Sequence, residues 1–253
     1  MEKRKLYLST IDANAQEYAR QYGLGLEIAE YCTAGNMDED FPRTDTAVRE
    51  KLKGIDRRMF HAPFNELFPC AIDPKARGLA HDRYRQAIAL AWEYGATRVV
   101  IHGGYQPFMY YPVWYTEQSV PFWRAFLKEL PEDTTILLEN VLEEQPQMLL
   151  DIVKTVDDPR LRLCLDIGHA NVYSKVPVLE WLEVLAPWIG HFHIHNNDGS
   201  WDTHSPLNQG NIPIRDLLIR AETLCPEATY TLELTESAAS VRLLLEESLW
   251  NRN

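Results

Sequence analysis

The stretch Arg162-Leu163-Cys164-Leu165-Asp166-Ile167-Gly168-His169-Ala170 (residues 162–170) joins a short apolar run to an acidic residue and, three residues later, a histidine. Short apolar runs that alternate with longer amphipathic stretches are typical of parallel strands and the helices between them. Seven more such runs occur along the chain. The eight predicted strands cover residues 5–9, 25–29, 58–61, 98–102, 135–139, 162–166, 191–195 and 229–234.

Helix signals between these strands agree with a repeating strand–helix pattern. Asp73-Pro74 is expected to begin a long helix and Gly95 to end it after Tyr94, because proline suits the first turn of a helix and glycine the position after its last. The final helix is expected over roughly residues 237–250. Eight strand–helix pairs in 253 residues predict an α/β fold, a single (β/α)8 TIM barrel.

No linker rich in glycine, proline or serine and no shift in composition divides the chain, so we expect one TIM-barrel domain over residues 1–253. A doubly wound open sheet is the alternative fold. It is disfavoured because residues 9–12, Ser-Thr-Ile-Asp, stand where that fold has a glycine-rich phosphate-binding turn.

Six consecutive predicted strands, the third to the eighth, end with a side chain that can bind a metal. These residues are His61, His102, Glu139, Asp166, His195 and Glu233. The C-terminal ends of all strands of a (β/α)8 barrel meet at one face, so we expect these side chains to point toward one cavity. Imidazole and carboxylate groups suit Zn²⁺ or Mn²⁺. Without a cation or another partner, burying so many ionisable groups would cost several kcal/mol per charge.

Three further candidate ligands lie in the loops after the sixth and seventh strands: His169, Asp202 and His204. Any single one of the nine candidates is explained equally well by a helix cap or a structural hydrogen bond, so the prediction depends on the whole set. His191 and His193 share a strand face with His195, and we expect them to line the barrel interior rather than bind metal.

The motifs around these residues resemble the xylose-isomerase-like TIM barrel superfamily, which includes sugar phosphate isomerases and epimerases and also endonuclease IV (AP endonuclease family 2). The resemblance covers about residues 25–236. It rests on the order and spacing of seven short motifs: His61-Ala62-Pro63-Phe64, Ile101-His102-Gly103-Gly104, Leu138-Glu139-Asn140, Leu165-Asp166-Ile167-Gly168-His169-Ala170, His195-Asn196-Asn197-Asp198, Asp202-Thr203-His204-Ser205-Pro206 and Leu232-Glu233.

The resemblance implies a divalent metal, Zn²⁺ or Mn²⁺, at one to three ions per chain. The metal shared by the superfamily would be bound by Glu139, Asp166, His195 and Glu233. The likeness to endonuclease IV implies two more positions, one at His61, His102 and Glu139 and the other at His169, Asp202 and His204. Glu139 would then bridge two metals through its two oxygens. The candidate catalytic residues are Glu139, Glu233 and His169.

Two reactions suit this set of residues. A sugar or sugar-phosphate isomerase or epimerase would use one metal to polarise a carbonyl, while Glu139 and Glu233 remove and return the proton on the neighbouring carbon. A phosphoester hydrolase resembling endonuclease IV would use several metals to ionise a water and to stabilise the attacking and leaving oxygens. A metal-binding barrel without catalysis is the third alternative.

Two features of the sequence bear on that choice. Epimerases of this superfamily typically have an arginine a few residues after the seventh-strand histidine, and this chain has Gly199, Ser200 and Trp201 there, which argues against simple epimerisation. The net charge of −12 and the acidic loop at residues 36–40 would repel a phosphate backbone. We expect an isomerase or epimerase-like enzyme with a small sugar or sugar phosphate as its partner, and nucleic-acid binding is disfavoured.

Aromatic side chains are dense at residues 105–115, after the fourth predicted strand. Sugar rings stack on aromatic faces, so Tyr105, Trp114 and Trp201 are the candidate substrate-binding residues. The alternatives for this loop are a contact within a homo-oligomer, or packing of the loop on its own side chains.

The cysteines and the first residues of the chain bear on its location. The four cysteines form no CxxC pair, the N-terminal residues contain no signal-peptide core, and no run of about 18 apolar residues occurs. We therefore expect a cytoplasmic protein without a membrane segment. Cys164, in an apolar strand, is expected to be an inert core thiol.

Overall fold

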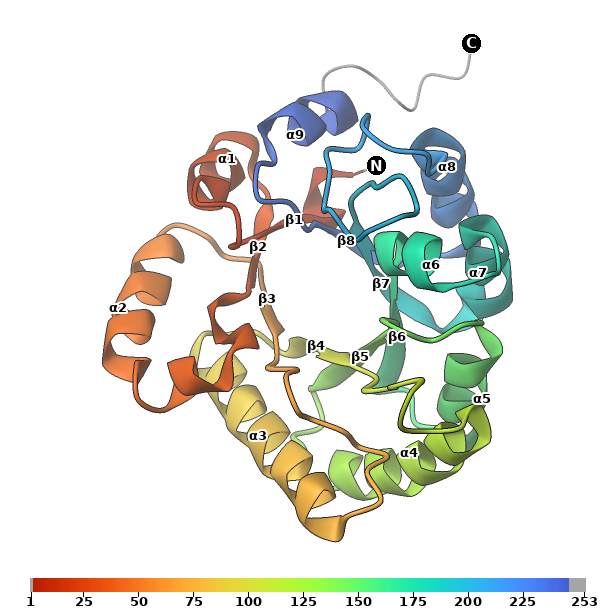
Figure 1. The fold of residues 1–253 in the computed structure, drawn as a ribbon. Helices are drawn as coiled ribbons and strands as arrows, with labels where there is room; N and C mark the ends of the chain where they lie inside the picture. Colours follow the sequence, from red (N-terminus) through yellow and green to blue (C-terminus); the bar gives the residue numbers. More distant parts are fainter. Residues whose placement is uncertain (1, 246–253) are drawn as a thin grey trace.

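The computed structural model describes residues 2–245 and forms a closed barrel of eight parallel strands in the order β1 to β8. Figure 1 shows the strands at the centre and the helices outside them. The strands are β1 (Leu6–Ser9), β2 (Gly25–Ile28), β3 (Arg58–His61), β4 (Arg98–His102), β5 (Thr135–Glu139), β6 (Leu161–Asp166), β7 (Ile189–Ile194) and β8 (Thr229–Leu232). The ring closes where β1 pairs with β8, with Leu6 opposite Tyr230. The predicted (β/α)8 barrel is confirmed.

Helices follow the strands along the chain and form the outer layer of the barrel (Figure 1). They are α1 (Ala15–Tyr22), α2 (Phe41–Lys51), α3 (Pro74–Glu93), α4 (Pro112–Leu127), α5 (Gln147–Val156), α6 (Ile167–Tyr173), α7 (Val178–Leu185), α8 (Ile214–Leu224) and α9 (Ala238–Leu245). Both α6 and α7 stand between β6 and β7. Four short 3-10 turns complete the described elements: η1 (Lys3–Lys5), η2 (Glu30–Cys32), η3 (Ala34–Met37) and η4 (Ala186–Trp188).

Apolar side chains pack on both surfaces of the strands. The larger cluster lies between the strands and the helices, and a smaller one inside the barrel consists of Tyr7, Met59, Val100, Leu137 and Cys164. Because the side chains of a strand alternate between its two surfaces, the positions of one strand serve both clusters. Burying an apolar side chain of this size stabilises a fold by about 1.5–3 kcal/mol. Burial raises the pKa of the Cys164 thiol to about 12, as expected of an inert core thiol.

The signals at the two ends of α3 act as predicted. Asp73 caps the helix by accepting a hydrogen bond from Lys75 N at 2.7 Å. Gly95 follows Tyr94 with φ of +73°, a conformation that glycine adopts without the steric cost of a side chain. Among residues 2–245, no helix is both long enough and apolar enough to cross a membrane.

Five predicted strands differ from the observed ones by one or two residues, and the difference affects two candidate ligands. His195 and Glu233 lie one residue past the ends of β7 and β8, and not inside these strands as expected. The reason is that the β7–β8 ladder ends with Ile194 opposite Leu232, after which Asn196 pairs antiparallel with Ser205. The final helix begins at residue 238 instead of 237, and its expected end at residue 250 lies outside the described residues.

Candidate metal centre

The nine candidate metal ligands lie together at the C-terminal end of the barrel. They occupy the last positions of β3 to β6, the residues that follow β7 and β8, the first turn of α6 and the loop after β7. Because neighbouring parallel strands end side by side, this arrangement collects side chains that are far apart in the sequence. They form three groups, described in turn.

The first group consists of His61, His102 and Glu139, whose ligand atoms lie within 4.8 Å of one another. Glu139 Oε2 is 3.3 Å from His61 Nε2 and 3.4 Å from His102 Nε2. Phe64 stacks on the His102 ring at 4.3 Å between centroids and meets the His61 ring edge-on at 5.8 Å. The aromatic residue of the His61-Ala62-Pro63-Phe64 motif therefore holds both rings of this group.

The second group consists of Glu139, Asp166, His195 and Glu233. Its three carboxylates lie around His193, and His195 contacts Asp166. The Nδ1 atom of His193 lies 3.2 Å from Glu139 Oε1, 3.2 Å from Glu233 Oε2 and 3.7 Å from Asp166 Oδ2. His195 Nε2 lies 3.2 Å from both carboxylate oxygens of Asp166. The three carboxylates that the resemblance assigns to one metal thus meet at His193, and His195 joins them through Asp166.

The third group consists of His169, Asp202 and His204, again within 4.8 Å of one another. Asp202 Oδ2 lies 3.2 Å from His169 Nε2 and 3.0 Å from His204 Nε2. His204 has φ of +45°, a conformation that costs a residue other than glycine about 1–3 kcal/mol. In this conformation the His204 ring stacks on the His195 ring, with 4.0 Å between centroids. The strained backbone of His204 thus places its imidazole against a second candidate ligand.

Three of the histidines share one pattern of hydrogen bonding. Each uses Nδ1 to donate to a backbone carbonyl: His61 to Ala62 O at 2.9 Å, His169 to Asn140 O at 2.9 Å and His204 to Glu233 O at 2.8 Å. A carbonyl oxygen can only accept, so Nδ1 carries the proton and Nε2 is left to bind a ligand. Fixing the tautomer in this way is what proteins do at metal-binding histidines.

Unpaired polar atoms show that this arrangement suits a cation. Glu139 Oε2, His195 Nδ1 and Asp202 Oδ1 are buried and have no hydrogen-bond partner among the described residues. In the neutral tautomer, His61 Nε2 and Glu139 Oε2 are both acceptors and cannot satisfy each other, whereas a cation between them would bind both. Imidazole with carboxylate is also the donor set of Zn²⁺ and Mn²⁺ sites. The residues present therefore fit a divalent metal.

The charges of the cluster are balanced between carboxylates and histidines. Burial acts to raise the pKa of Glu139, but the neighbouring His193 and His102 hold it well below its usual range. Burial acts to lower the pKa of His204, but its hydrogen bond to Asp202 and the charges of Glu233 and Asp202 raise it to about 9. Burial lowers the pKa of His102 to about 3. Near neutral pH, Glu139 is therefore ionised, His102 is neutral and His204 carries a second proton, which a metal bound at His204 would displace.

Two neighbouring residues fix the positions of Asp166 and His195. Asn140 donates from Nδ2 to Asp166 O and accepts at Oδ1 from Asp166 N, both at 2.9 Å. Asp166 in turn caps α6 by accepting from His169 N at 2.7 Å. Gly168 lies so close to the His195 ring that a Cβ there would be 1.9 Å from Cε1 of the imidazole. The absence of a side chain at residue 168 therefore makes room for His195.

Sequence reasoning missed Glu27, which lies on β2 inside the barrel and is fully buried. Its carboxylate is 2.9 Å from His193 Nε2 and 3.3 Å from His191 Nε2, and it accepts from Thr231 Oγ1 at 2.6 Å. His191 and His193 line the interior as predicted, and Glu27 is their common partner. The only signal in the sequence was an acidic residue, Glu27, within the otherwise apolar run Gly25–Ile28. This signal points to a functional position only when it is known that the side chain of residue 27 faces the barrel interior.

The three candidate substrate-binding aromatics differ in exposure. Tyr105 is buried and packs on Tyr115 at 5.1 Å between ring centroids. Trp114 is half-buried, and its indole N–H donates to Cys70 O at 2.8 Å. Trp201 is 69% exposed. Tyr105 and Trp114 are thus held by contacts within the protein, whereas the Trp201 ring faces solvent.

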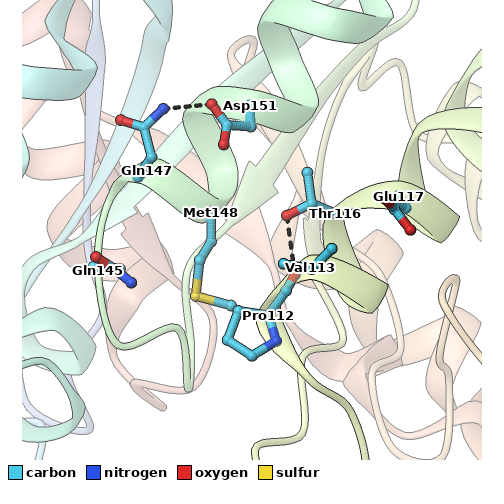
Figure 2. Close-up of a pocket in the computed structure, with 8 residues that line it drawn as sticks. All are labelled: Pro112, Val113, Thr116, Glu117, Gln145, Gln147, Met148 and Asp151. Carbon is cyan, nitrogen blue, oxygen red and sulfur yellow. Dashed lines mark hydrogen bonds between the residues drawn. The ribbon is translucent and has the colours of Figure 1, made fainter.

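A separate pocket lies between the first turns of α4 and α5, beside the end of the aromatic loop (Figure 2). Val113 and Met148 contribute apolar surface to it. Thr116 Oγ1 donates to Pro112 O at 3.1 Å at its edge. None of the nine candidate ligands lines this pocket, so it is distinct from the metal centre.

The sequence profile of the xylose isomerase-like TIM barrel family matches residues 17–238, a range that includes all nine candidate ligands. The chain belongs to this family. Its membership and the closed barrel agree with the resemblance that the short motifs indicate.

Relatives of this xylose isomerase-like protein include MJ1311, an uncharacterized protein of Methanocaldococcus jannaschii that is 32% identical over 187 residues, 68% of this chain and 62% of that protein. The chain spans about three fifths of the length of the curated relatives it matches. A solved structure of a D-tagatose 3-epimerase-like protein has a TM-score of 0.78 at 24% identity and covers 96% of both chains. The TTHB071 protein of Thermus thermophilus, solved after soaking with ZnCl2, has a TM-score of 0.75 at 24% identity and covers 98% of this chain and 100% of that one.

Proposed function

We propose that this protein is a divalent-metal-dependent isomerase or epimerase that acts on a small sugar or sugar phosphate. The observation that carries the proposal is a pair of buried carboxylates, Glu139 and Glu233, which approach one point from the ends of β5 and β8. Each has an oxygen 3.2 Å from His193 Nδ1. Two carboxylates beside one reacting carbon can remove its proton from one face and return a proton to the other.

The residues around this pair supply the rest of the chemistry. Asp166 and His195, with the two glutamates, are the ligands that would hold the metal. When bound, the metal supplies Lewis-acid polarisation of a substrate carbonyl, which acidifies the neighbouring C–H bond. Glu139 and Glu233 move the proton at that carbon. His169, whose Nε2 lies 3.2 Å from Asp202, is the candidate for moving a proton at a substrate oxygen.

Three further observations support this assignment. A similar solved structure is that of a D-tagatose 3-epimerase-like protein, and another was soaked with zinc. The net charge of −12 favours a small substrate over a polyanion. Trp201 directly precedes Asp202 in the loop after β7 and is exposed, so its ring is available to stack on a sugar.

A phosphoester hydrolase is the second candidate, and one observation favours it. Besides the four shared ligands, the structure brings His61, His102 and Glu139 together in one group of ligand atoms and His169, Asp202 and His204 together in another. Clustered metals can ionise a water and stabilise both oxygens of a displaced phosphoester bond.

Loading the protein with Mn²⁺ and measuring proton exchange separates the two candidates. The isomerase proposal predicts about one Mn²⁺ per chain and uptake of solvent deuterium at the carbon next to the carbonyl of a ketose or ketose phosphate. Glu233→Gln should lose this exchange, because one of the two proton-moving carboxylates is gone.

His204 provides the decisive variant, since it lies outside the set of four shared ligands. In a single-metal isomerase, His204→Ala should keep its metal and mainly weaken substrate binding. A protein that binds about three metals, and whose His204→Ala variant loses one of them together with nearly all turnover, would overturn the isomerase proposal and support the hydrolase.

A further inference from the structure

Glu27 is a carboxylate inside the barrel, at a place where stability alone favours an apolar side chain. It lies on β2 and is fully buried, and its partner in the β2–β3 ladder, Met59, belongs to the apolar cluster of the barrel interior. Moving a carboxylate out of water costs free energy, and apolar side chains of similar volume are often at least as stabilising as a buried ion pair. The carboxylate at residue 27 therefore points to a role beyond folding.

Both oxygens of Glu27 are held by side chains of β7 and β8. Oε1 lies 2.9 Å from His193 Nε2, while Oε2 accepts from Thr231 Oγ1 at 2.6 Å and lies 3.3 Å from His191 Nε2. Burial acts to raise the pKa of Glu27, but the neighbouring His193 and His191 hold it well below its usual range. An ionised carboxylate can only accept, so His193 Nε2 carries a proton and donates a hydrogen bond to Glu27.

The other ring nitrogen of His193 faces the metal centre. Nδ1 lies 3.2 Å from Glu139 Oε1 and 3.2 Å from Glu233 Oε2. Because the two nitrogens lie on different sides of an imidazole, the bond from Nε2 to Glu27 fixes the ring so that Nδ1, and not a carbon, faces these two carboxylates. The His61 ring lies over the His193 ring, with centroids 5.8 Å apart and an interplanar angle of 26°, and restricts its tilt.

We propose that Glu27 is a positioning residue, which holds the His193 ring and through it sets the places of the two proton-moving carboxylates, Glu139 and Glu233. The inference rests on the proposed function, because the spacing of these carboxylates matters for turnover only if both act at one carbon. Without an acceptor for Nε2 the ring is free to turn, and the two carboxylates lose the contact that they share. Displacing a reacting group by about 1 Å can lower turnover about 100-fold.

Steady-state kinetics of the Mn²⁺-loaded protein test this role, with D-fructose, D-tagatose and their 6-phosphates as substrates. Glu27→Leu keeps a similar volume and removes both acceptors. It should lower kcat about 100-fold, change KM by less than about threefold and still bind about one Mn²⁺ per chain. Glu27→Gln keeps one oxygen that can accept from His193 Nε2, so its kcat should fall only about tenfold. A merely structural role would change the melting temperature and not this division between kcat and KM.

A double-mutant cycle shows whether Glu27 acts through His193. His193→Phe keeps a ring but removes both nitrogens, and should lower kcat at least as much as Glu27→Leu. If the effect of Glu27 passes through this ring, the double variant should be no slower than His193→Phe alone. The matched control is Met59→Leu, a change beside Glu27 in the barrel interior, which should keep wild-type kcat because methionine and leucine are similar in volume.

The outcomes separate this inference from the proposed function. If Glu27→Leu does not fold, as read by circular dichroism, Glu27→Gln decides alone, and a wild-type kcat in it would refute the positioning role. Wild-type kcat in both folded variants, or losses that multiply in the double variant, would overturn the role of Glu27 and leave the isomerase proposal standing. A Mn²⁺-loaded wild type that neither exchanges nor interconverts any of these sugars would overturn both.

Discussion

Gly168→Ala is the substitution that tests the geometry of the metal centre most directly. An ideal Cβ at residue 168 would lie 1.9 Å from His195 Cε1 and 2.5 Å from both ring nitrogens. Since ordinary contact begins at 3.4 Å, the imidazole or α6 must move by about 1.5 Å to accept a methyl group.

Neither the ring nor the helix is free to make that movement. His195 is stacked on His204 at 4.0 Å, and its Nε2 lies 3.2 Å from Asp166. Asp166 also caps α6 through His169 N at 2.7 Å, so a shift of the helix would disturb a second candidate ligand. Misplacing a catalytic group by about 1 Å can lower turnover about 100-fold, and disturbed ligand orientation lowers metal affinity about 10- to 100-fold. We expect both effects in Gly168→Ala.

Competition with a chromophoric chelator measures the metal affinity, and thermal melting followed by circular dichroism shows whether the barrel remains folded. Gly78→Ala is the matched control, because a Cβ at this position of α3 meets no described atom within 4 Å. It should leave metal affinity unchanged and stabilise the helix by about 0.5–1 kcal/mol. Wild-type metal affinity and turnover in Gly168→Ala would refute the argument that residue 168 positions His195.

Glu139→Gln and Asp166→Asn should each lower metal content and abolish activity while circular dichroism shows an intact fold, because each removes a charged ligand; full metal content in both would contradict the ligand assignment. Burial raises the pKa of Glu143, although its carboxylate accepts hydrogen bonds from Val141 N and Tyr115 Oη. The protonated Glu143 carboxyl therefore contributes stability that is fully present below the pKa of Glu143 in the unfolded chain. This stability is lost as the pH rises through the pKa of Glu143 in the folded protein. Urea unfolding should therefore show Glu143→Gln gaining stability relative to the wild type as the pH rises above about 4.3, the pKa of an unperturbed glutamate, and a difference that stays constant with pH would argue against a destabilised buried carboxylate. Fluorescence anisotropy should show only weak binding to an abasic DNA duplex at physiological salt, given the net charge of −12, and submicromolar affinity would instead favour the hydrolase.

The fold was predictable because each strand carries its own local signal. The bounds of β3, β4 and β5 match the predicted ranges to the residue, since each apolar run ends sharply at a histidine or glutamate. The ends of β7 and β8 were not predictable in this way. They are set by the pairing of Asn196 with Ser205, a contact between loop residues that no strand pattern contains.

The sequence predicted the candidate metal-binding residues better than it predicted the residues that contact and position them. Residues such as His102 and Glu139 stand at strand ends, where the barrel fold alone says that they converge. Glu27 was not singled out, because its role depends on contacts made only when the barrel closes. Glu27 meets His193 across the barrel interior. The left-handed backbone of His204 likewise depends on its three-dimensional setting.

The backbone carbonyls that orient His61, His169 and His204 have a consequence for how this barrel can change over evolution. A side-chain acceptor can be lost through a single codon change, whereas a peptide carbonyl is present whichever amino acid occupies the position. The orientation of these three imidazoles is therefore inherited with the path of the main chain and tolerates sequence drift at Ala62 and Asn140 as far as this bond is concerned. The loops that contact substrate can therefore change in sequence while the three imidazoles keep their orientation. New substrate specificities can then arise around an unchanged set of candidate metal-binding residues.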